Sequence, residues 1–328
     1  MNSKSELLIE ITKKCGLNCK YCSSNSDKNS SLHLNFKTIE SLIKDSTKLN
    51  ISNVQLSGGE PFLHQDFLKI CKLIISNKKI LDIYTSGNIF HGNKLTPLDN
   101  SFLEELKKLK INELRFNLQS HKKAIHNFLT NTKSFENTIT SIKNSINLRL
   151  NVVIHFIPLK VNYKLLEDSI CFFKNLGVSR VKLLRFVPHG RGAINNKILE
   201  LTKNEYINLI KILFELKEKY EDFIEIGSSF NIYFNKQNIT FCRECRMGKH
   251  KIAITPGGNV YPCVSTKHFK IFNFNINEKS LYEIIKSKRY ISIITRLMDN
   301  LIICNCLPEN TLNSLKNLCP TQEIMQKN

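Results

Sequence analysis

The first 190 residues alternate between short apolar runs and stretches with helical spacing, and this alternation limits the folds open to the chain. Strands that alternate with helices are typical of a parallel sheet covered by helices, because parallel neighbours need a crossover connection. We expect an α/β fold built as a partial (β/α)6 barrel of the TIM type. The expected strands are 7–12, 54–57, 80–85, 113–118, 150–157 and 181–187, and the expected helices are 36–49, 67–76, 102–109, 135–146 and 165–176.

Polar and glycine-rich motifs follow the expected strands. The sequence Cys-Gly-Leu-Asn-Cys-Lys-Tyr-Cys occupies residues 15–22, after the first strand, and Gly-Gly-Glu-Pro occupies residues 58–61, after the second. In barrel-type α/β folds the carboxyl ends of the strands carry the chemistry. We therefore expect the two motifs to be neighbours at one edge of the sheet.

The first motif brings three cysteines, Cys15, Cys19 and Cys22, into eight residues with the spacing C-x3-C-x2-C. Thiolates are the usual protein ligands of a 4Fe–4S cluster, and three of them leave one iron open to bind a small molecule. The alternatives are a zinc site or buried thiols. Zinc usually takes a fourth Cys or His nearby, and the nearest histidine is His33, so the spacing favours the cluster.

Composition places the chain among globular proteins with reduced thiols. It has 328 residues, 41% hydrophobic and 23% charged, with no apolar run of 18 residues and no signal peptide. These features predict a cytoplasmic protein without a membrane span, in a compartment where disulfides are rare. Eleven cysteines then indicate metal or cluster binding.

The formal charge of +20 could suit nucleic acid, an acidic peptide or a phosphorylated substrate. However, the lysines are dispersed, and no block of five basic residues occurs. Nucleic acid is therefore not the favoured partner.

The pattern changes beyond the expected barrel. We divide the chain into a barrel core at 1–195, a helical linker at 196–235, a small second domain at 236–320 and a tail at 321–328. The second domain holds an expected β-hairpin at 252–261 with a glycine turn. Two further cysteines, Cys71 and Cys171, lie within helical patterns, and we expect both to be buried small hydrophobic residues.

Together the motifs resemble those of the radical S-adenosylmethionine (SAM) superfamily. The resemblance includes Tyr21 before the last cysteine, and it continues in Tyr-Thr-Ser-Gly-Asn at 84–88, in the stretch 132–136 and in Asn162 after the fifth strand. It implies an enzyme that cleaves SAM reductively to a 5′-deoxyadenosyl radical, which takes hydrogen from a substrate carbon.

The resemblance also implies roles for individual residues. Cys15, Cys19 and Cys22 would hold the 4Fe–4S cluster, and its open iron would bind SAM. The motif residues Gly58, Gly59, Glu60 and Pro61 would contact the methionine part, where the glycines let backbone approach and Glu60 takes the ammonium. Ser86 and Gln119 would lie near the carboxylate and ribose, although Gln119 departs from the acidic residue of many relatives.

The second domain resembles the SPASM or twitch extension of this superfamily, through Cys245, Gly258 and Cys263. It implies an auxiliary 4Fe–4S cluster held by Cys242, Cys245 and Cys263. A fourth ligand would come from one of three later cysteines, which are Cys304, Cys306 and Cys319. A second auxiliary cluster, held partly by ligands other than cysteine, is an alternative that the sequence does not decide.

The resemblance is consistent with two classes of substrate. One is a peptide, modified by a cross-link, a thioether or epimerisation. The other is a small molecule or nucleotide. The expected first strand begins within ten residues of Met1, so we expect a peptide-recognition domain to be absent or to be supplied by a partner protein. A one-electron donor such as flavodoxin or ferredoxin is the further partner. A third interpretation is a nucleic-acid-binding protein that contains a cluster. The Gly-Gly-Glu-Pro motif argues against this interpretation.

Basic and polar residues near the strand ends are candidates for the substrate side. An arginine there could pair with a carboxylate or phosphate, and a histidine could be catalytic or a satisfied core residue. The candidates are Arg185, His189, His155, Arg191 and the inward-pointing Gln55.

Overall fold

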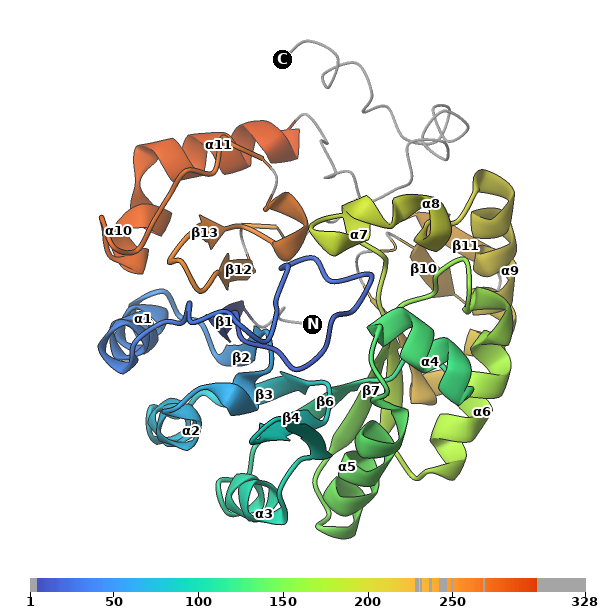
Figure 1. The fold of residues 1–328 in the computed structure, drawn as a ribbon. Coiled ribbons are helices and arrows are strands. Elements are labelled where there is room, and N and C mark those ends of the chain that lie inside the picture. The colour runs from blue at the N-terminus through green and yellow to red at the C-terminus, as the bar shows by residue number, and fades with distance from the viewer. Residues whose placement is uncertain are drawn as a thin grey trace.

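A curved, mostly parallel sheet with helices on its outer side forms the body of the protein (Figure 1). The computed structural model describes residues 5–227, 230, 232–235, 238–241, 247–248, 250–267 and 269–299. The largest sheet in these ranges has nine strands in the order β13-β12-β1-β2-β3-β6-β7-β8-β9, and every neighbouring pair in it is parallel except β12 and β13. This architecture confirms the predicted fold class.

Most predicted elements lie within a few residues of the observed ones. The strands of the main sheet are β1 Glu6–Thr12, β2 Asn53–Gly58, β3 Ile80–Thr85, β6 Glu113–Asn117, β7 Val152–Phe156, β8 Arg180–Leu183, β9 Ile224–Ile226, β12 Lys251–Ile254 and β13 Val260–Tyr261. The helices are α1 Phe36–Lys48, α2 Phe67–Ser76, α3 Asn100–Lys108, α4 Lys123–Thr130, α5 Phe135–Asn147, α6 Leu166–Asn175, α7 Arg191–Ile194, α8 Asn196–Leu199, α9 Lys203–Tyr220, α10 Leu281–Lys286 and α11 Lys288–Asp299.

Alternation along each strand separates an apolar outer face of the sheet from a polar inner face. On β1, Leu7, Ile9 and Ile11 are fully buried in the main hydrophobic core with residues of α1 and α2, and the corresponding positions of the next strands are also apolar. The register aligns the intervening positions, such as Gln55 with Asp82. The inner face is therefore where polar groups from different strands can meet.

The sheet contains a parallel strand that the sequence did not reveal. Strand β9 pairs with β8, and α9 is the helix that connects them. The range 203–220, expected in a linker, is thus part of the helical layer, and its first turn is closed by a capping box between Thr202 and Glu205. With only three residues, β9 is too short to show alternation.

The hairpin β12–β13 does not stand apart from the barrel. Strand β12 pairs in parallel with β1, so the hairpin extends the main sheet beyond its first strand (Figure 1). Helix α10 then packs against α1, where the carboxylate of Asp45 accepts a hydrogen bond from the amide of Tyr282 at 3.1 Å. The domain boundaries at 195 and 235 stay a prediction.

Several other elements were not predicted. They are the hairpin of β4 Asn88–His91 with β5 Lys94–Pro97, the two-stranded sheet of β10 Ile232–Asn235 with β11 Asn238–Phe241, and the helices α4, α7 and α8.

One prediction about the cysteines was wrong. Cys71 is fully buried in α2, as expected, but Cys171 is exposed because it lies on the solvent side of α6. None of the described helices is long and apolar enough to cross a membrane.

Candidate active site

The cysteine loop follows β1 and is held at both ends by backbone hydrogen bonds. The amide of Cys15 donates to the carbonyl of Asp27 at 2.9 Å, and the amide of Lys20 donates to the carbonyl of Leu129 in α4 at 2.9 Å. Tyr21 packs in a small apolar cluster with Leu129 and other residues of the strand ends. Figure 1 shows this dark-blue loop reaching from β1 towards α4 and α7.

The three thiols of the loop lie within electrostatic reach of one another. Burial raises the pKa of Cys15 well above its usual value, and neighbouring Cys19, Glu60 and Cys22 raise it further. Burial, with a contribution from Cys22, likewise raises the pKa of Cys19 to about 12. Thiolates in such a place need a cation beside them, so the donor set suits an iron–sulfur cluster.

Across the described parts of the chain, no three His, Cys, Asp or Glu side chains are arranged to hold a single metal ion. The amide of Leu17 donates to the sulfur of Cys15 at 3.4 Å.

Gly58 and Gly59 bring the end of β2 against the backbone that leads into the cysteine loop. The amide of Gly59 donates to the carbonyl of Thr12 at 2.6 Å, and the amide of Glu60 donates to the carbonyl of Lys14 at 2.8 Å. A Cβ on Gly59 would lie 2.1 Å from the carbonyl oxygen of Lys14, and Gly58 has φ +136°. The protein's own backbone therefore leaves no room for a side chain at either position.

Glu60 is fully buried at the start of the 3₁₀ turn Pro61–Leu63. Its carboxylate accepts hydrogen bonds from the hydroxyl of Thr85 at 2.8 Å and from the amide and hydroxyl of Ser86 at 2.8 and 2.6 Å. Burial raises the pKa of Glu60 to about 7 even though these donors lower it. A buried carboxylate held by neutral donors is a fitting partner for an ammonium group.

Gln119 and Asn162 hold the ends of β6 and β7 together. The amide nitrogen of Gln119 donates to the side chain of Asn117 at 2.5 Å and to the carbonyl of His155 at 3.1 Å, and its oxygen accepts from the amide of Ile157 at 2.8 Å. Asn162 donates to the carbonyl of Gln119 at 2.9 Å. Both amide hydrogens of Gln119 are thus used by protein acceptors.

The inner face of the sheet carries a buried ionic network that the sequence analysis missed. Arg115 donates to Asp82 at 2.6 Å, to Glu113 at 2.7 Å and to the hydroxyl of Tyr84 at 2.9 Å. Tyr84 in turn donates to Gln55 at 3.3 Å, so the expected inward direction of Gln55 is confirmed. The polar residues at every second position of these strands were the signal that could have shown it.

The network continues to the far strands of the sheet. Arg180 donates to Glu113 and, at 3.1 Å, to Glu225, and Lys182 donates to Glu225. The charges inside the barrel are therefore matched by charges of opposite sign.

His155 also faces the inside of the barrel. It is 4% exposed, and its ring lies edge-on to Tyr84 at 4.9 Å between centroids. Both ring nitrogens are buried, and neither has a hydrogen-bond partner among the described residues. Burial, with the nearby charges of Arg115 and Lys182, keeps the pKa of His155 far below its usual value. The imidazole is neutral and can offer one donor and one acceptor to another molecule.

The other basic candidates contact the protein itself. A ring nitrogen of His189 lies 3.1 Å from the carbonyl of Ser265, and the Nε of Arg191 donates to the carbonyl of Cys19 at 2.9 Å. Arg185 is buried, and burial lowers its pKa to about 10, with Tyr206 and Cys263 among the groups that oppose this shift.

The second expected cluster site is described only in part. Cys263 is half-buried, and it lies near Arg185 and just before the short turn 264–266. The other expected ligands lie outside the described residues; they are Cys242, Cys245, Cys304, Cys306 and Cys319.

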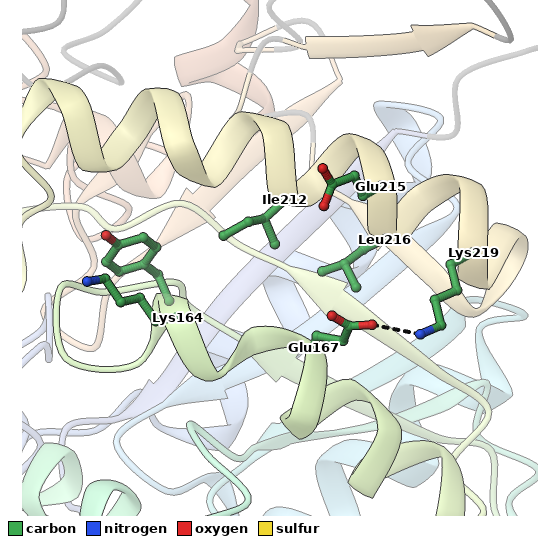
Figure 2. Close-up of a pocket in the computed structure, with 7 residues that line it drawn as sticks. Lys164, Glu167, Ile212, Glu215, Leu216 and Lys219 are labelled. Carbon is green, nitrogen blue, oxygen red and sulfur yellow. Dashed lines mark hydrogen bonds and ion pairs between the residues drawn. The ribbon is translucent and has the colours of Figure 1, made fainter.

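A surface pocket between α6 and α9 lies on the helical layer, away from the strand ends (Figure 2). Its clearest polar contact is the ion pair of Lys219 with Glu167 at 2.7 Å, and both side chains are more than half exposed. The pocket has no part in the site described above.

Comparison with known proteins identifies the class to which this fold and site belong. The model of the radical SAM superfamily matches residues 9–172, and that of SPASM, an iron–sulfur cluster-binding domain, matches residues 242–307. The chain belongs to the radical SAM superfamily and carries a SPASM domain. Membership implies SAM and a 4Fe–4S cluster as cofactors, and the SPASM domain implies an auxiliary iron–sulfur cluster.

The names of two curated relatives point to different substrates. The chain is 27% identical over 274 residues to a probable GTP 3′,8-cyclase of Methanocaldococcus jannaschii, covering 79% of this chain and 84% of the relative. It is 25% identical over 283 residues to a PqqA peptide cyclase of a Methylobacterium species, covering 85% and 72%. These names support the conclusion that the chain is an enzyme.

Among solved structures, SuiB of Streptococcus suis, bound to its precursor peptide SuiA, has the same fold. The TM-score is 0.70 at 16% identity, with 89% of this chain and 67% of SuiB covered.

Proposed function

We propose that this chain is a radical SAM enzyme that takes a hydrogen atom from a residue of a peptide and leaves it cross-linked, joined in a thioether or epimerised. Cys15, Cys19 and Cys22 would hold the 4Fe–4S cluster, and the motif 58–61 would bind the methionine part of SAM. The observation that carries this assignment is the position of Glu60. Its buried carboxylate, with a pKa near 7 and neutral donors around it, lies within electrostatic reach of Cys15.

The residues of the chain would position SAM and exclude water, while the cofactors perform the difficult step. Glu60 would bind the ammonium of SAM, and Thr85 and Ser86 fix the direction of its carboxylate. When bound, the reduced cluster and SAM together supply a 5′-deoxyadenosyl radical that takes hydrogen from a substrate carbon. Gln119 would act by keeping the neighbouring strand ends rigid.

Two features support a peptide over a nucleotide. Five cations near the barrel have protein partners: Arg115, Arg180 and Lys182 are paired within the barrel, Lys267 donates to Glu10, and Arg191 donates to the cysteine loop. A polyphosphate would need several cations to bind it. The neutral His155 could instead pair with a backbone amide, which offers one donor and one acceptor.

The similarity to GTP cyclases makes a nucleotide the second candidate for the substrate.

We also propose two protein partners, a one-electron donor such as flavodoxin or ferredoxin and a separate peptide-recognition protein. The SPASM ligands would be Cys242, Cys245 and Cys263 with one of Cys304, Cys306 and Cys319.

The test is anaerobic reconstitution followed by measurement of 5′-deoxyadenosine. The wild-type chain should form it from SAM and a reductant, and the triple change of Cys15, Cys19 and Cys22 to Ala should not. Product from the triple variant would refute the assignment of the cluster. A synthetic peptide that matches a short Cys- or Gly-rich reading frame found beside the gene should raise the rate, whereas stimulation by GTP alone would refute the peptide proposal.

A further inference from the structure

The segment 189–195 covers the outer side of the cysteine loop and holds three of its carbonyl groups. The Nε of Arg191 donates to the carbonyl of Cys19 at 2.9 Å, and its backbone amide donates to the carbonyl of Cys22 at 3.0 Å. The side chain of Asn195 donates to the carbonyl of Lys20 at 3.1 Å. Two of these carbonyls belong to proposed cluster ligands, so the contacts fix the backbone from which those thiols project.

The fit between the two segments is close. Gly190 has φ +55°, and a Cβ there would lie 2.7 Å from the carbonyl oxygen of Cys22 and 3.0 Å from that of Ser23. The glycine therefore lets the segment lie against the loop with no side chain between them. Asn195 also donates to the carbonyl of Arg191 at 2.8 Å, which closes the short helix α7 on itself and fixes both donors together.

Arg191 also brings a positive charge to the loop. The hydrogen bond from its Nε to the carbonyl of Cys19 at 2.9 Å holds the guanidinium beside this proposed ligand. The reduction potential of an iron–sulfur cluster depends on the charge and hydrogen bonds around it. A fixed cation near the ligands makes addition of an electron easier.

We propose that Arg191, together with Asn195, is a positioning residue that holds the cysteine loop in place and raises the reduction potential of the cluster bound there. This inference rests on the proposed role of Cys15, Cys19 and Cys22. It gives Arg191 a role different from pairing with a carboxylate or phosphate of the substrate.

The positional part is tested by hydrogen exchange on the metal-free chain. Arg191→Gln and Asn195→Ala should each make amides in the peptide 16–24 exchange about fivefold faster, the effect of one lost hydrogen bond of about 1 kcal/mol. Lys197→Gln is the matched control, because it removes a positive charge from an exposed position of α8. Equal exchange in wild type, Arg191→Gln and Asn195→Ala would refute the positional part.

The electrostatic part is tested by a redox titration of the reconstituted full chain, followed by electron paramagnetic resonance. The signal that changes when SAM is added identifies the cluster of the cysteine loop. Arg191→Gln should lower its midpoint potential, whereas Arg191→Lys should leave the potential near that of wild type and still speed exchange. Lys197→Gln should change neither. An unchanged potential in Arg191→Gln would refute the electrostatic part.

The two proposals can fail separately. If the wild-type chain assembles no cluster that responds to SAM, or if the triple cysteine variant still assembles it, the proposed function fails. The exchange experiment uses no metal and would still decide whether the segment 189–195 fixes the loop.

Discussion

The carboxylate of Glu10 on β1 accepts a hydrogen bond from the ammonium of Lys267, which lies 257 positions later in the chain. The two side chains are only 7% and 12% exposed. The hydroxyl of Ser24 joins them, donating to Glu10 at 2.9 Å and accepting from Lys267 at 3.0 Å. One buried ion pair therefore connects the first strand, the cysteine loop and the segment after Cys263.

Removal of Lys267 should destabilise the protein. Lys267→Met leaves Glu10 as a buried charge without its cation, so the free energy of unfolding should fall by about 3 kcal/mol. Urea unfolding at neutral pH measures the change. Lys270→Met, at an exposed position nearby, is the control. The double variant Glu10→Gln with Lys267→Met should recover part of the loss, and equal stability of Lys267→Met and Lys270→Met would contradict the role of the pair.

SAM binding should depend on pH through Glu60. The pKa of this carboxyl is about 7 in the SAM-free protein, so it is mostly protonated at pH 6 and mostly ionised at pH 8. Because an ammonium binds the ionised form, SAM affinity of the reconstituted protein should rise about tenfold from pH 6 to pH 8. Calorimetric titration at both values gives the ratio. Glu60→Gln should bind weakly at both, and an equal pH dependence in this variant would show that another group is responsible.

The same carboxyl has an effect on stability with the opposite sign. Its pKa in the folded protein lies above the ordinary value of 4.5, so the folded state favours the protonated form. Its contribution to the free energy of unfolding of the SAM-free chain should therefore decrease as the pH rises from about 4.5 to about 7. Urea unfolding measures the free energy of unfolding across this range. The value for wild type, relative to that for Glu60→Gln, should fall as the pH rises. A constant difference would contradict the raised pKa.

The ionic network inside the barrel should require Arg115. Arg115→Met leaves Asp82 and Glu113 buried with fewer donors, and the free energy of unfolding should fall by about 3–5 kcal/mol. Arg115→Lys keeps the charge but cannot reach three acceptors with a planar fork, so it should lie between that variant and wild type. Thermal unfolding of the three proteins gives the order, and a Lys variant as unstable as the Met variant would show that charge alone is not what matters.

The two helical cysteines should behave differently. Cys71 is fully buried among apolar side chains and Cys171 is exposed. Cys71→Ser should cost about 1–3 kcal/mol, because it buries a hydroxyl. Cys171→Ser should stay within about 0.5 kcal/mol of wild type. In the folded protein, iodoacetamide should alkylate Cys171 and spare Cys71; alkylation of Cys71 at the same rate would contradict its burial.

The sequence was most informative where the physical signal is local. Helix α1 was predicted to within one residue because its apolar positions repeat at helical spacing and Asn35 caps it, accepting from the amide of Thr38 at 2.9 Å. The positions of the cysteine loop and of Gly-Gly-Glu-Pro at the ends of β1 and β2 followed from the parallel arrangement alone.

Features that depend on distant partners could not be predicted. Strand β12 reads as one arm of a hairpin, and nothing in its sequence says that its other edge pairs with β1. Arg191 and His189 were candidates for the substrate side because they follow β8. The structure shows that they contact the backbone carbonyls of Cys19 and Ser265, and such partners have no side-chain signature in the sequence.

The pairing of β1 with β12 has a consequence for synthesis of the chain. After β1 has left the ribosome, it obtains its second neighbour only when residues 251–254 have been made. At about 5–20 residues per second, this takes roughly 10 to 50 s. During that time one edge of β1 offers unpaired backbone groups to other nascent chains, which is a known route to aggregation. Slow translation or a shortage of chaperones should therefore reduce the yield of native protein.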